Sequence, residues 1–354
     1  MIIYYILILL PILLYYLSAR FYPKTVCCKI AITVFFAILL FMLVLRSETV
    51  GRDVTTYHLY FNGIAKTEWR NLPKVNLEIG YVFINKLIAS IGGNYRVLLV
   101  VVALITIIPI WLIYYYEGED APTEIVIFIN MSTFLMFFSG FRQSIAVSLG
   151  AIAFMFVKRK KIIFFLLTVA AALLFHNSAF ILLLMYPMYH IKLKKKYLPV
   201  IIGIILAVFI FNRPIFNFLS SFVSDVHNAD KSITNTGAYG MIILLILFVA
   251  FSYVIPDEKS LSKEIYGLRN FLLLSLTLQL FAPVNFLAMR MNYYYIIFIP
   301  VLISKIVSNP SVKWRQVAVL GKYVIMAVMM FNFFVLVVRQ NALDTFPYEF
   351  VWQV

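Results

Sequence analysis

Residues 158–196 read KRKKIIFFLLTVAAALLFHNSAFILLLMYPMYHIKLKKK, an apolar run bounded by lysine at both ends. The run from Ile162 to His190 would measure about 44 Å as one helix, against about 30 Å for the hydrocarbon core of a bilayer. Clusters of basic residues remain on the cytoplasmic side of a membrane. We therefore expect two short helices that turn back at His176, Asn177 and Ser178, with His176 at the outward end.

Composition excludes a soluble domain. The chain has 354 residues, of which 63% are hydrophobic and 13% charged, whereas globular domains have about 45–50% and about 25%. Twelve crossings of roughly 20 residues each would leave about 114 positions, too few for a separate soluble catalytic domain. The net charge of +15 comes from basic residues between the apolar runs, which orient a membrane protein, so nucleic acid is not an expected partner.

The predicted fold is an all-α polytopic integral membrane protein with about 12 transmembrane helices. We expect one transmembrane domain, 1–354, with extracytoplasmic loops at 46–95 and 213–237 and the N-terminus outside. The predicted crossings are 2–18, 26–45, 96–116, 124–139, 143–157, 162–175, 178–191, 198–212, 238–255, 270–286, 291–307 and 317–338. The predicted cytoplasmic connections hold 17 of the 30 basic residues, at 20–29, 158–161, 192–196, 259–269 and 305–315.

By the same argument, residues 270–307 are predicted to form a hairpin that turns around 283–290. A third predicted hairpin, 124–157, turns at 140–143, although only its second end has a basic flank. The three short hairpins thus place polar turns outward, carrying Arg142, His176 and Arg290. Ionisable residues at membrane depth are costly and are candidates for function.

The first outer loop is rich in polar and aromatic residues. Asp53, Tyr57 and Phe61 are spaced by four and so share one helix face. Gly51 is expected to serve a tight turn. Residues 76–93, NLEIGYVFINKLIASIGG, are amphipathic and are predicted to lie in the membrane interface. Tyr57, Phe61 and Tyr81 are candidates for stacking on sugar rings, or alternatively anchor the loop to lipid.

Several chemistries have no supporting motif. There is no phosphate-binding GxxxxGK[ST] loop, no GxSxG, no HExxH and no DxD pair. Two adjacent cysteines and four histidines suggest neither a disulfide framework nor a metal site. We therefore expect no cofactor and no metal. The acidic residues Glu117, Glu119 and Asp120 are interpreted as a solvated loop rather than as catalytic groups.

The outward turns contain groups suited to an anionic substrate. The guanidinium of Arg142, beside Gln143, presents a planar fork that matches phosphate or carboxylate, and Arg290 offers the same group. Two such arginines suit a diphosphate; the alternative is that each side chain reaches lipid headgroups from a helix end. The tyrosines beside Arg290 look equally like an aromatic belt.

Two residues are candidates for acid–base chemistry. His176 is a general base or a hydrogen-bond donor to a leaving group, unless it is only a polar turn residue. Asp53 is the other possible base, unless it merely caps the following helix.

Several segments together resemble one known family. They are Gly51-Arg52-Asp53 with Tyr57 and Phe61, EIGY at 78–81, FRQSIA at 141–146, FHNSA at 175–179, Arg290 before three tyrosines, and PYEF at 347–350. This combination resembles the EpsG family, which is similar to the Wzy-type polymerases of bacterial exopolysaccharide, capsule and O-antigen. The FRQSIA and FHNSA segments are the most specific.

The resemblance implies a GT-C-like membrane glycosyltransferase of the bacterial plasma membrane, with its active site facing the periplasm or exterior. Its substrates would be repeat units linked to undecaprenyl diphosphate, and its partners a flippase and a chain-length regulator. The growing glycan would pass from its lipid to the non-reducing end of the next unit. The resemblance gives catalytic roles to His176, Asp53, Arg142 and Arg290, and substrate-binding roles to Arg52, Gln143, Tyr57, Glu78, Tyr81 and Tyr294.

Three alternatives use similar sequence features. A flippase for the lipid-linked unit would share the substrate, although flippases commonly show internal repeats and mid-membrane charges, which are not evident here. A glycan ligase is barely separable from a polymerase by sequence. A membrane acyltransferase is disfavoured because no His/Asp pair is visible.

Overall fold

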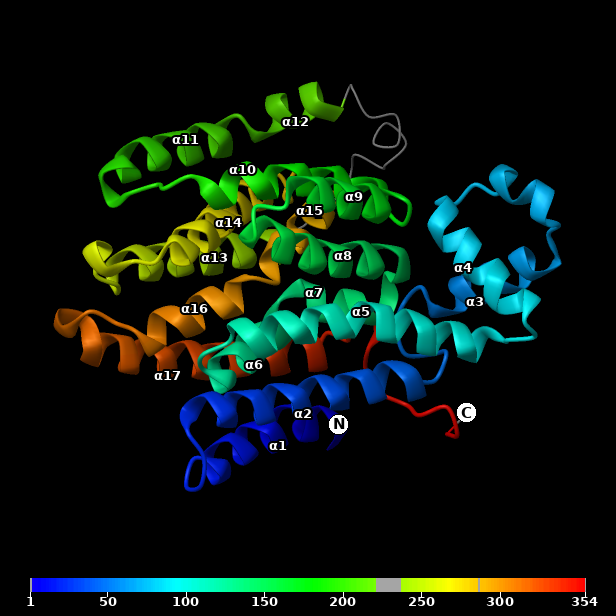
Figure 1. Ribbon diagram of the computed structural model, residues 1–354, viewed down its shortest axis with the longest axis horizontal. Helices are drawn as coiled ribbons and strands as arrows, with labels where there is room; N and C mark the ends of the chain where they lie inside the picture. Colours follow the sequence, from blue (N-terminus) through cyan, green and yellow to red (C-terminus); the bar gives the residue numbers. More distant parts are fainter. Residues whose placement is uncertain (1, 221–236, 286, 354) are drawn as a thin grey trace. The chain divides into compact units, whose positions relative to one another are not determined.

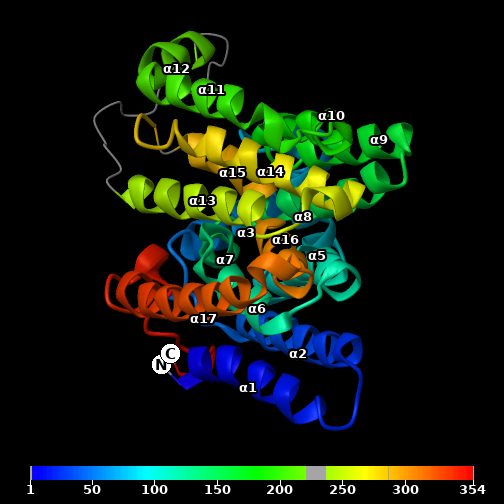
Figure 2. The same cartoon turned by 90° about the vertical axis from the view of Figure 1, so that its left-hand side faces the viewer.

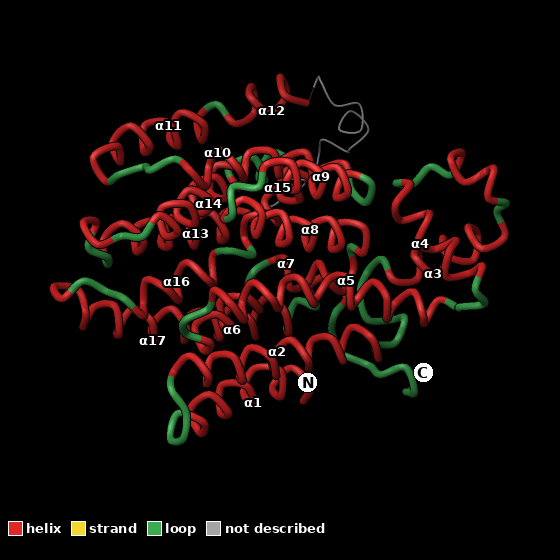
Figure 3. Tube along the Cα trace, viewed as in Figure 1, coloured by secondary structure: helices red, strands yellow, loops and turns green. Residues whose placement is uncertain are grey.

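The computed structural model describes residues 2–220, 237–285 and 287–353. In these ranges the chain is helical, and Figure 3 shows helices joined by loops. No β-strand occurs in the described ranges; the pairing of β type there is a single bridge between Arg46 and Phe350. The predicted all-α class is therefore confirmed.

The chain forms two compact units. The first comprises residues 1–180 and 321–354, and the second comprises residues 181–320. The single transmembrane domain stays a prediction, and most of the second predicted outer loop, 213–237, lies outside the described residues.

The first unit contains the helices that surround the candidate site. They are α1 (Ile2–Ser18), α2 (Lys24–Leu45), α3 (Val54–Lys66), a 3-10 helix (Trp69–Lys74), α4 (Ile79–Ser90), α5 (Tyr95–Glu117), α6 (Ala121–Asn130), α7 (Ser132–Ser139), α8 (Phe141–Lys158), α9 (Ile162–Leu173), most of α17 (Arg315–Asn332), a π-helical segment (Phe333–Val338) and a 3-10 turn (Ala342–Asp344). Figure 2 shows α1 and α2 packed side by side.

The helices long and apolar enough to cross a membrane number five in the described part of the chain, or seven if each bent pair is one span. The five are Lys24–Leu45, Tyr95–Glu117, Phe141–Lys158, Ala288–Ser308 and Arg315–Val335. The bent pairs include α6 with α7, at 58°. The predicted apolar runs coincide with helices, but several are shorter than a full span, so the count of twelve stays a prediction.

Local sequence explains where several helices begin. The side chain of Asn94 accepts a hydrogen bond from the backbone N–H of Val97 and caps α5. Asp120 caps α6 in the same way, and Pro122 fits the first turn because that turn needs no N–H donor there. These caps satisfy N–H groups that the helix itself leaves unpaired.

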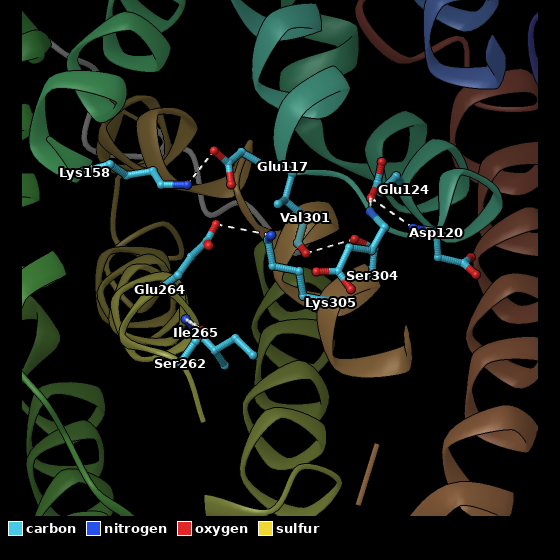
Figure 4. Close-up of polar contacts among 11 residues, drawn as sticks. Glu117, Asp120, Glu124, Lys158, Ser262, Glu264, Ile265, Val301, Ser304 and Lys305 are labelled. Atoms are coloured by element: carbon cyan, nitrogen blue, oxygen red, sulfur yellow. Dashed lines mark hydrogen bonds and ion pairs between the residues drawn. The ribbon is translucent and has the colours of Figure 1, made fainter. Parts of the chain in front are cut away.

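The first unit has two chemically different ends. At one end, Arg46 donates to the carbonyl of Phe138, and the hydroxyl of Tyr95 donates to the carbonyl of Val54. Figure 1 shows α3 and α4 at the amino-terminal end of α5. At the opposite end, the Lys158 ammonium pairs with Glu117, as Figure 4 shows. The predicted outward turn at 140–143 thus lies at the end opposite the predicted cytoplasmic connection at 158–161.

The acidic segment at this second end corrects the sequence interpretation. Asp120 and Glu124 are buried, and the ammonium of Lys322 on α17 lies 2.7 Å from the Asp120 carboxylate. The Glu124 carboxylate accepts a hydrogen bond from the backbone N–H of Glu119. A solvated loop is therefore wrong for Asp120, because its carboxylate joins the start of α6 to α17, while the carboxylate of Glu124 closes the turn.

Replacing Lys322 with methionine is expected to lower the free energy of unfolding by about 3 to 5 kcal/mol, because it leaves the Asp120 carboxylate buried without its cation. The side chains are only 11% and 6% exposed, so water compensates little. Thermal unfolding in detergent measures the change, with the exposed Arg20→Met as the control. Adding Asp120→Asn should recover part of the loss. Equal unfolding temperatures for Lys322→Met and the control would contradict this role.

The second unit is built around α14 (Lys263–Gln279), most of whose residues are buried. Its other helices are α10 (Met185–His190), α11 (Leu198–Ile210), α12 (Asn212–Ser220), α13 (Gly237–Val254), α15 (Leu287–Ile296) and α16 (Ile299–Ser308). The ring of Phe271 contacts those of Tyr295 and Phe298. The Asn292 side chain bonds to Ser275 and Gln279, and Lys305 pairs with Glu264 (Figure 4). These polar side chains of the second unit are therefore paired with one another.

Candidate functional site

Arg142 is the centre of the candidate site. It is the second residue of α8, and its guanidinium forms an ion pair with the carboxylate of Glu78. The two side chains are 27% and 14% exposed. Glu78 precedes α4 and makes no side-chain cap to that helix, so its carboxylate is directed to the arginine instead. A carboxylate thus already occupies part of the fork that was expected to bind an anion.

Aromatic rings hold the first turn of α8. The ring of Tyr57 lies parallel to that of Phe141, with centroids 4.3 Å apart and an angle of 9°. Tyr81 meets Tyr57 edge-on at 5.5 Å. Burial raises the pKa of Tyr57, and the neighbouring Arg142 opposes the rise. The hydroxyl of Tyr57 is therefore a neutral group beside the guanidinium.

The burial of these rings bears on the expected sugar contacts. Tyr57, Phe61 and Tyr81 belong to one buried cluster that also contains Tyr95 and Phe141. In this arrangement their faces are covered by other side chains, so their observed role is packing. Stacking on sugar stays a prediction, and so does a substrate-binding role for Tyr57 and Tyr81.

Glycine explains why α4 reaches the segment before His176. The backbone N–H of Gly80 donates to the carbonyl oxygen of Leu174 at 2.8 Å. A Cβ atom on Gly80 would lie 2.8 Å from that same oxygen, closer than real Cβ atoms approach. The glycine of EIGY therefore allows the backbone that follows Glu78 to contact the backbone that precedes His176.

The hydrogen bonds of His176 define the position of its ring proton. Its Nδ1 accepts the backbone N–H of Ser178 at 3.2 Å and lies 2.8 Å from the Ser178 hydroxyl. A backbone N–H can only donate, so Nδ1 is unprotonated here and the neutral ring carries its proton on Nε2. The ring itself accepts the hydrogen bond that closes this turn. In this state His176 is suited to donate a hydrogen bond from Nε2.

Asp53 is exposed at the start of α3. Its side chain makes no cap hydrogen bond, so capping does not explain this residue. A helix N-terminus stabilises a negative charge. Gly51, two residues earlier, has φ +111°, and a Cβ atom there would lie 2.1 Å from the carbonyl oxygen of Phe138, which confirms that this turn requires glycine.

A segment near the C-terminus packs on the same outer loop. The N–H groups of Ser47 and Gly51 donate to the carbonyls of Glu349 and Asp344. Arg52 forms an exposed ion pair with Asp344 at 3.1 Å, and its backbone N–H bonds to the Ser139 hydroxyl. The GRD and PYEF segments thus lie next to each other. In the structure, Arg52 pairs with this C-terminal segment. Its expected role in substrate binding stays a prediction.

Arg46 was missed by the sequence analysis. It is 2% exposed, and its Nη1 donates to the carbonyl of Phe138 at 2.7 Å. Burial lowers its pKa to about 10, which leaves the guanidinium charged at neutral pH. The signal that could have found it is an arginine placed directly after the apolar run 26–45.

The predicted residues are divided between the two units. Arg52, Asp53, Tyr57, Glu78, Tyr81, Arg142, Gln143 and His176 belong to the first unit, whereas Arg290 and Tyr294 belong to the second. Gln143 is buried next to Arg142.

In the second unit Arg290 is exposed within α15, rather than in the turn before it. Tyr293, Tyr294 and Tyr295 are buried, and the hydroxyl of Tyr295 donates to the carbonyl of Ile181. An aromatic belt is therefore wrong for this run. A joint diphosphate site of Arg142 and Arg290 stays a prediction.

No group of three or more His, Cys, Asp or Glu residues that could hold a metal ion occurs among the residues that the structure describes. The two cysteines are free and buried. Independence from metal stays a prediction.

The fold and the site together define a class of protein. Apolar helices of spanning length carry polar and ionisable groups at one end of the first unit, which is typical of a multi-pass membrane protein with a site near the membrane surface. Among known families, the model of the EpsG family matches residues 29–350. The chain belongs to this family of Wzy-like polysaccharide polymerases. No curated protein and no solved structure matches it. Membership implies a function like that of a polysaccharide polymerase.

Proposed function

We propose that the protein is a polysaccharide polymerase that works on glycans linked to undecaprenyl diphosphate. It transfers the growing glycan from its lipid carrier to the non-reducing end of the next lipid-linked repeat unit. The observation that carries the proposal is the Arg142 guanidinium, which stands at the start of α8 against Glu78 and Tyr57. Membership of the EpsG family supports the same conclusion.

The proposed setting is the bacterial plasma membrane, in a GT-C-like arrangement of about twelve crossings. The end of the first unit that holds Arg142, Asp53 and His176 faces the periplasm or exterior. The positive-inside rule supports this orientation, since the opposite end holds Lys158 to Lys161. A flippase would supply the lipid-linked units to that side, and a chain-length regulator would act on the product.

Arg142 is proposed to bind the donor diphosphate. As the bond between the anomeric carbon and the diphosphate oxygen breaks, negative charge grows on that oxygen. A guanidinium held at the start of α8 stabilises this charge. Because Glu78 holds the fork in the structure, the diphosphate must take the place of that carboxylate at least in part. The expected roles of Arg290 and Tyr294 in substrate binding stay predictions.

The proposed roles of Asp53 and His176 follow from the hydrogen bonds that each side chain makes or lacks in the structure. Asp53 is the proposed base, since its carboxylate is exposed and not used as a cap, and it accepts the proton of the attacking hydroxyl. His176, with its proton on Nε2, is proposed to donate a hydrogen bond to the departing diphosphate. The reaction uses neither a nucleotide nor a metal ion in this scheme.

Two substitutions separate these roles. Asp53→Asn is expected to reduce polymer formation about 100-fold or more because it removes the base. His176→Gln can still donate a hydrogen bond and should lose less than Asp53→Asn. Chain length and polymer amount in cells, normalised to the protein in the membrane, give the comparison. If His176→Gln loses more polymer than Asp53→Asn, His176 is the base and the proposed role of Asp53 is wrong.

The function is tested by deleting the gene in its host and sizing the surface glycan and its lipid-linked precursors. The proposal expects single repeat units on the outer leaflet and no longer chains. Units trapped on the cytoplasmic leaflet would instead identify a flippase. Finished chains that remain on undecaprenyl diphosphate would identify a ligase. Either of these results would overturn the polymerase proposal.

A further inference from the structure

Arg46 is a buried cation that the proposed chemistry does not use. A buried charge is costly unless an opposite charge or hydrogen bonds compensate it. Its Nη1 bonds to the Phe138 carbonyl, and its Nε has no hydrogen-bond partner in the described part of the chain. Its guanidinium lies over the rings of Phe141 and Phe138, at 5.0 Å and 5.7 Å from their centroids. One carbonyl and two rings therefore hold this charge.

The groups that Arg46 contacts lie on both sides of a helix break. Phe138 belongs to the last turn of α7, where carbonyl groups lack helical partners and the helix dipole is negative. Phe141 is the first residue of α8, and Gly140 connects the two helices. One guanidinium thus fixes the end of α7 against the beginning of α8.

The ring of Phe141 is held from two directions. Tyr57 stacks on it in parallel, and the Arg46 guanidinium also lies over it. Arg142 is the next residue, and its guanidinium points to Glu78 and Tyr57. The direction in which α8 projects Arg142 therefore depends on how Phe141 is held.

We propose that Arg46 is a positioning residue for Arg142. It holds the Phe138 carbonyl and the Phe141 ring, and so sets the first turn of α8 in the orientation that pairs Arg142 with Glu78. The consequence for polymer formation rests on the proposed function. The positioning itself is a property of the protein without substrate and can be measured separately.

The first test is a set of double-mutant cycles on the purified full-length protein. Arg142→Gln and Glu78→Gln, alone and combined, give the coupling of the ion pair from their shifts in unfolding temperature. In an Arg46→Met background this coupling should fall by about half or more, because the pair loses its alignment. Arg96→Met is the matched control, since Arg96 donates to the backbone carbonyl of Arg46 and contacts the same loop. There the coupling should persist.

The second test is polymer formation in cells. Arg46→Met should reduce long-chain glycan about tenfold or more, as expected when a reacting group is misplaced. Arg46→Lys should restore part of it, because an ammonium can still donate to the Phe138 carbonyl but lacks the planar fork. If Arg46→Met does not fold, the same Arg142–Glu78 cycles are measured in Arg46→Lys. There the coupling of the ion pair should still fall, but by less than half.

Unchanged coupling in the Arg46 variants would overturn the positioning role. Wild-type chain length in Arg46→Met would overturn its consequence for polymer formation. If the coupling falls but the wild-type protein makes no polymer, the proposed function fails and the positioning role stands.

Discussion

Replacing Arg142 with alanine is expected to abolish glycans longer than a single repeat unit, while the protein still accumulates in the membrane. The guanidinium stabilises charge that develops on the leaving diphosphate, and removal of one such group costs about 100- to 1,000-fold in rate. Arg142→Lys keeps the positive charge but loses the planar fork, so strong impairment is expected there too. Gel analysis of the surface glycan, beside quantification of membrane protein, measures both effects.

A matched control comes from the first outer loop, 46–95, which also contains Glu78, the ion-pair partner of Arg142. Arg70 pairs with Glu68 on the surface at 2.6 Å, and both side chains are well exposed. Arg70→Ala removes an arginine from an ion pair but should leave chain length unchanged, because exposed pairs contribute little. Wild-type chain length in Arg142→Ala would contradict the proposed role of Arg142. Equal losses in both variants would show a general effect of charge on the loop.

The second large effect is expected for Gly51→Ala. A Cβ atom at this position would lie 2.1 Å from the carbonyl oxygen of Phe138 and 2.9 Å from a methyl group of Val54. The residue also has φ +111°, a conformation that alanine rarely adopts. The backbone must move away from the end of α7, and we expect a loss of at least about 3 kcal/mol in unfolding free energy. Thermal unfolding and the amount of protein in the membrane report this loss.

Gly63→Ala is the control for Gly51→Ala. Gly63 lies within α3, and a Cβ atom there would meet nothing within 4 Å. Alanine in a helix is favoured over glycine by roughly 0.5–1 kcal/mol, so this variant should be as stable as the wild type or slightly more. If Gly51→Ala unfolds at the same temperature as Gly63→Ala, the backbone of Gly51 does not lie as close to the Phe138 carbonyl as the structure places it.

The turns of the chain were predictable because they depend on local length and charge. The run from Ile162 to His190 is too long for one helix and has lysines at both ends, and the structure ends α9 at Leu173 and places a turn at His176. The break at Gly140 follows from the same kind of argument. Such features involve neighbouring residues, so a linear pattern contains them.

The partners of the charged groups were not predictable from one sequence. Glu78 and Arg142 are 64 residues apart, and Asp120 and Lys322 are 202 residues apart. Neither separation leaves a periodic signal, and both pairs depend on how helices pack. For this reason the acidic segment near Asp120 was wrongly interpreted as solvated. Arg46 was overlooked because an arginine at the end of a crossing is usually a headgroup contact.

The hydrogen bonds between residues 47–52 and 343–349 have a consequence for biosynthesis. Thr49 and its partner Glu349 are 300 residues apart, so the ribosome makes the outer loop long before it makes the segment that pairs with it. Until then the N–H groups of Ser47, Gly51 and Arg52 lack the carbonyl partners that they have in the folded protein. The loop beside Phe138 can reach its final conformation only after α17 has been inserted. Assembly of the site is thus a late event in synthesis, because the outer loop stays unfinished until residues 343–349 have been made and have left the ribosome.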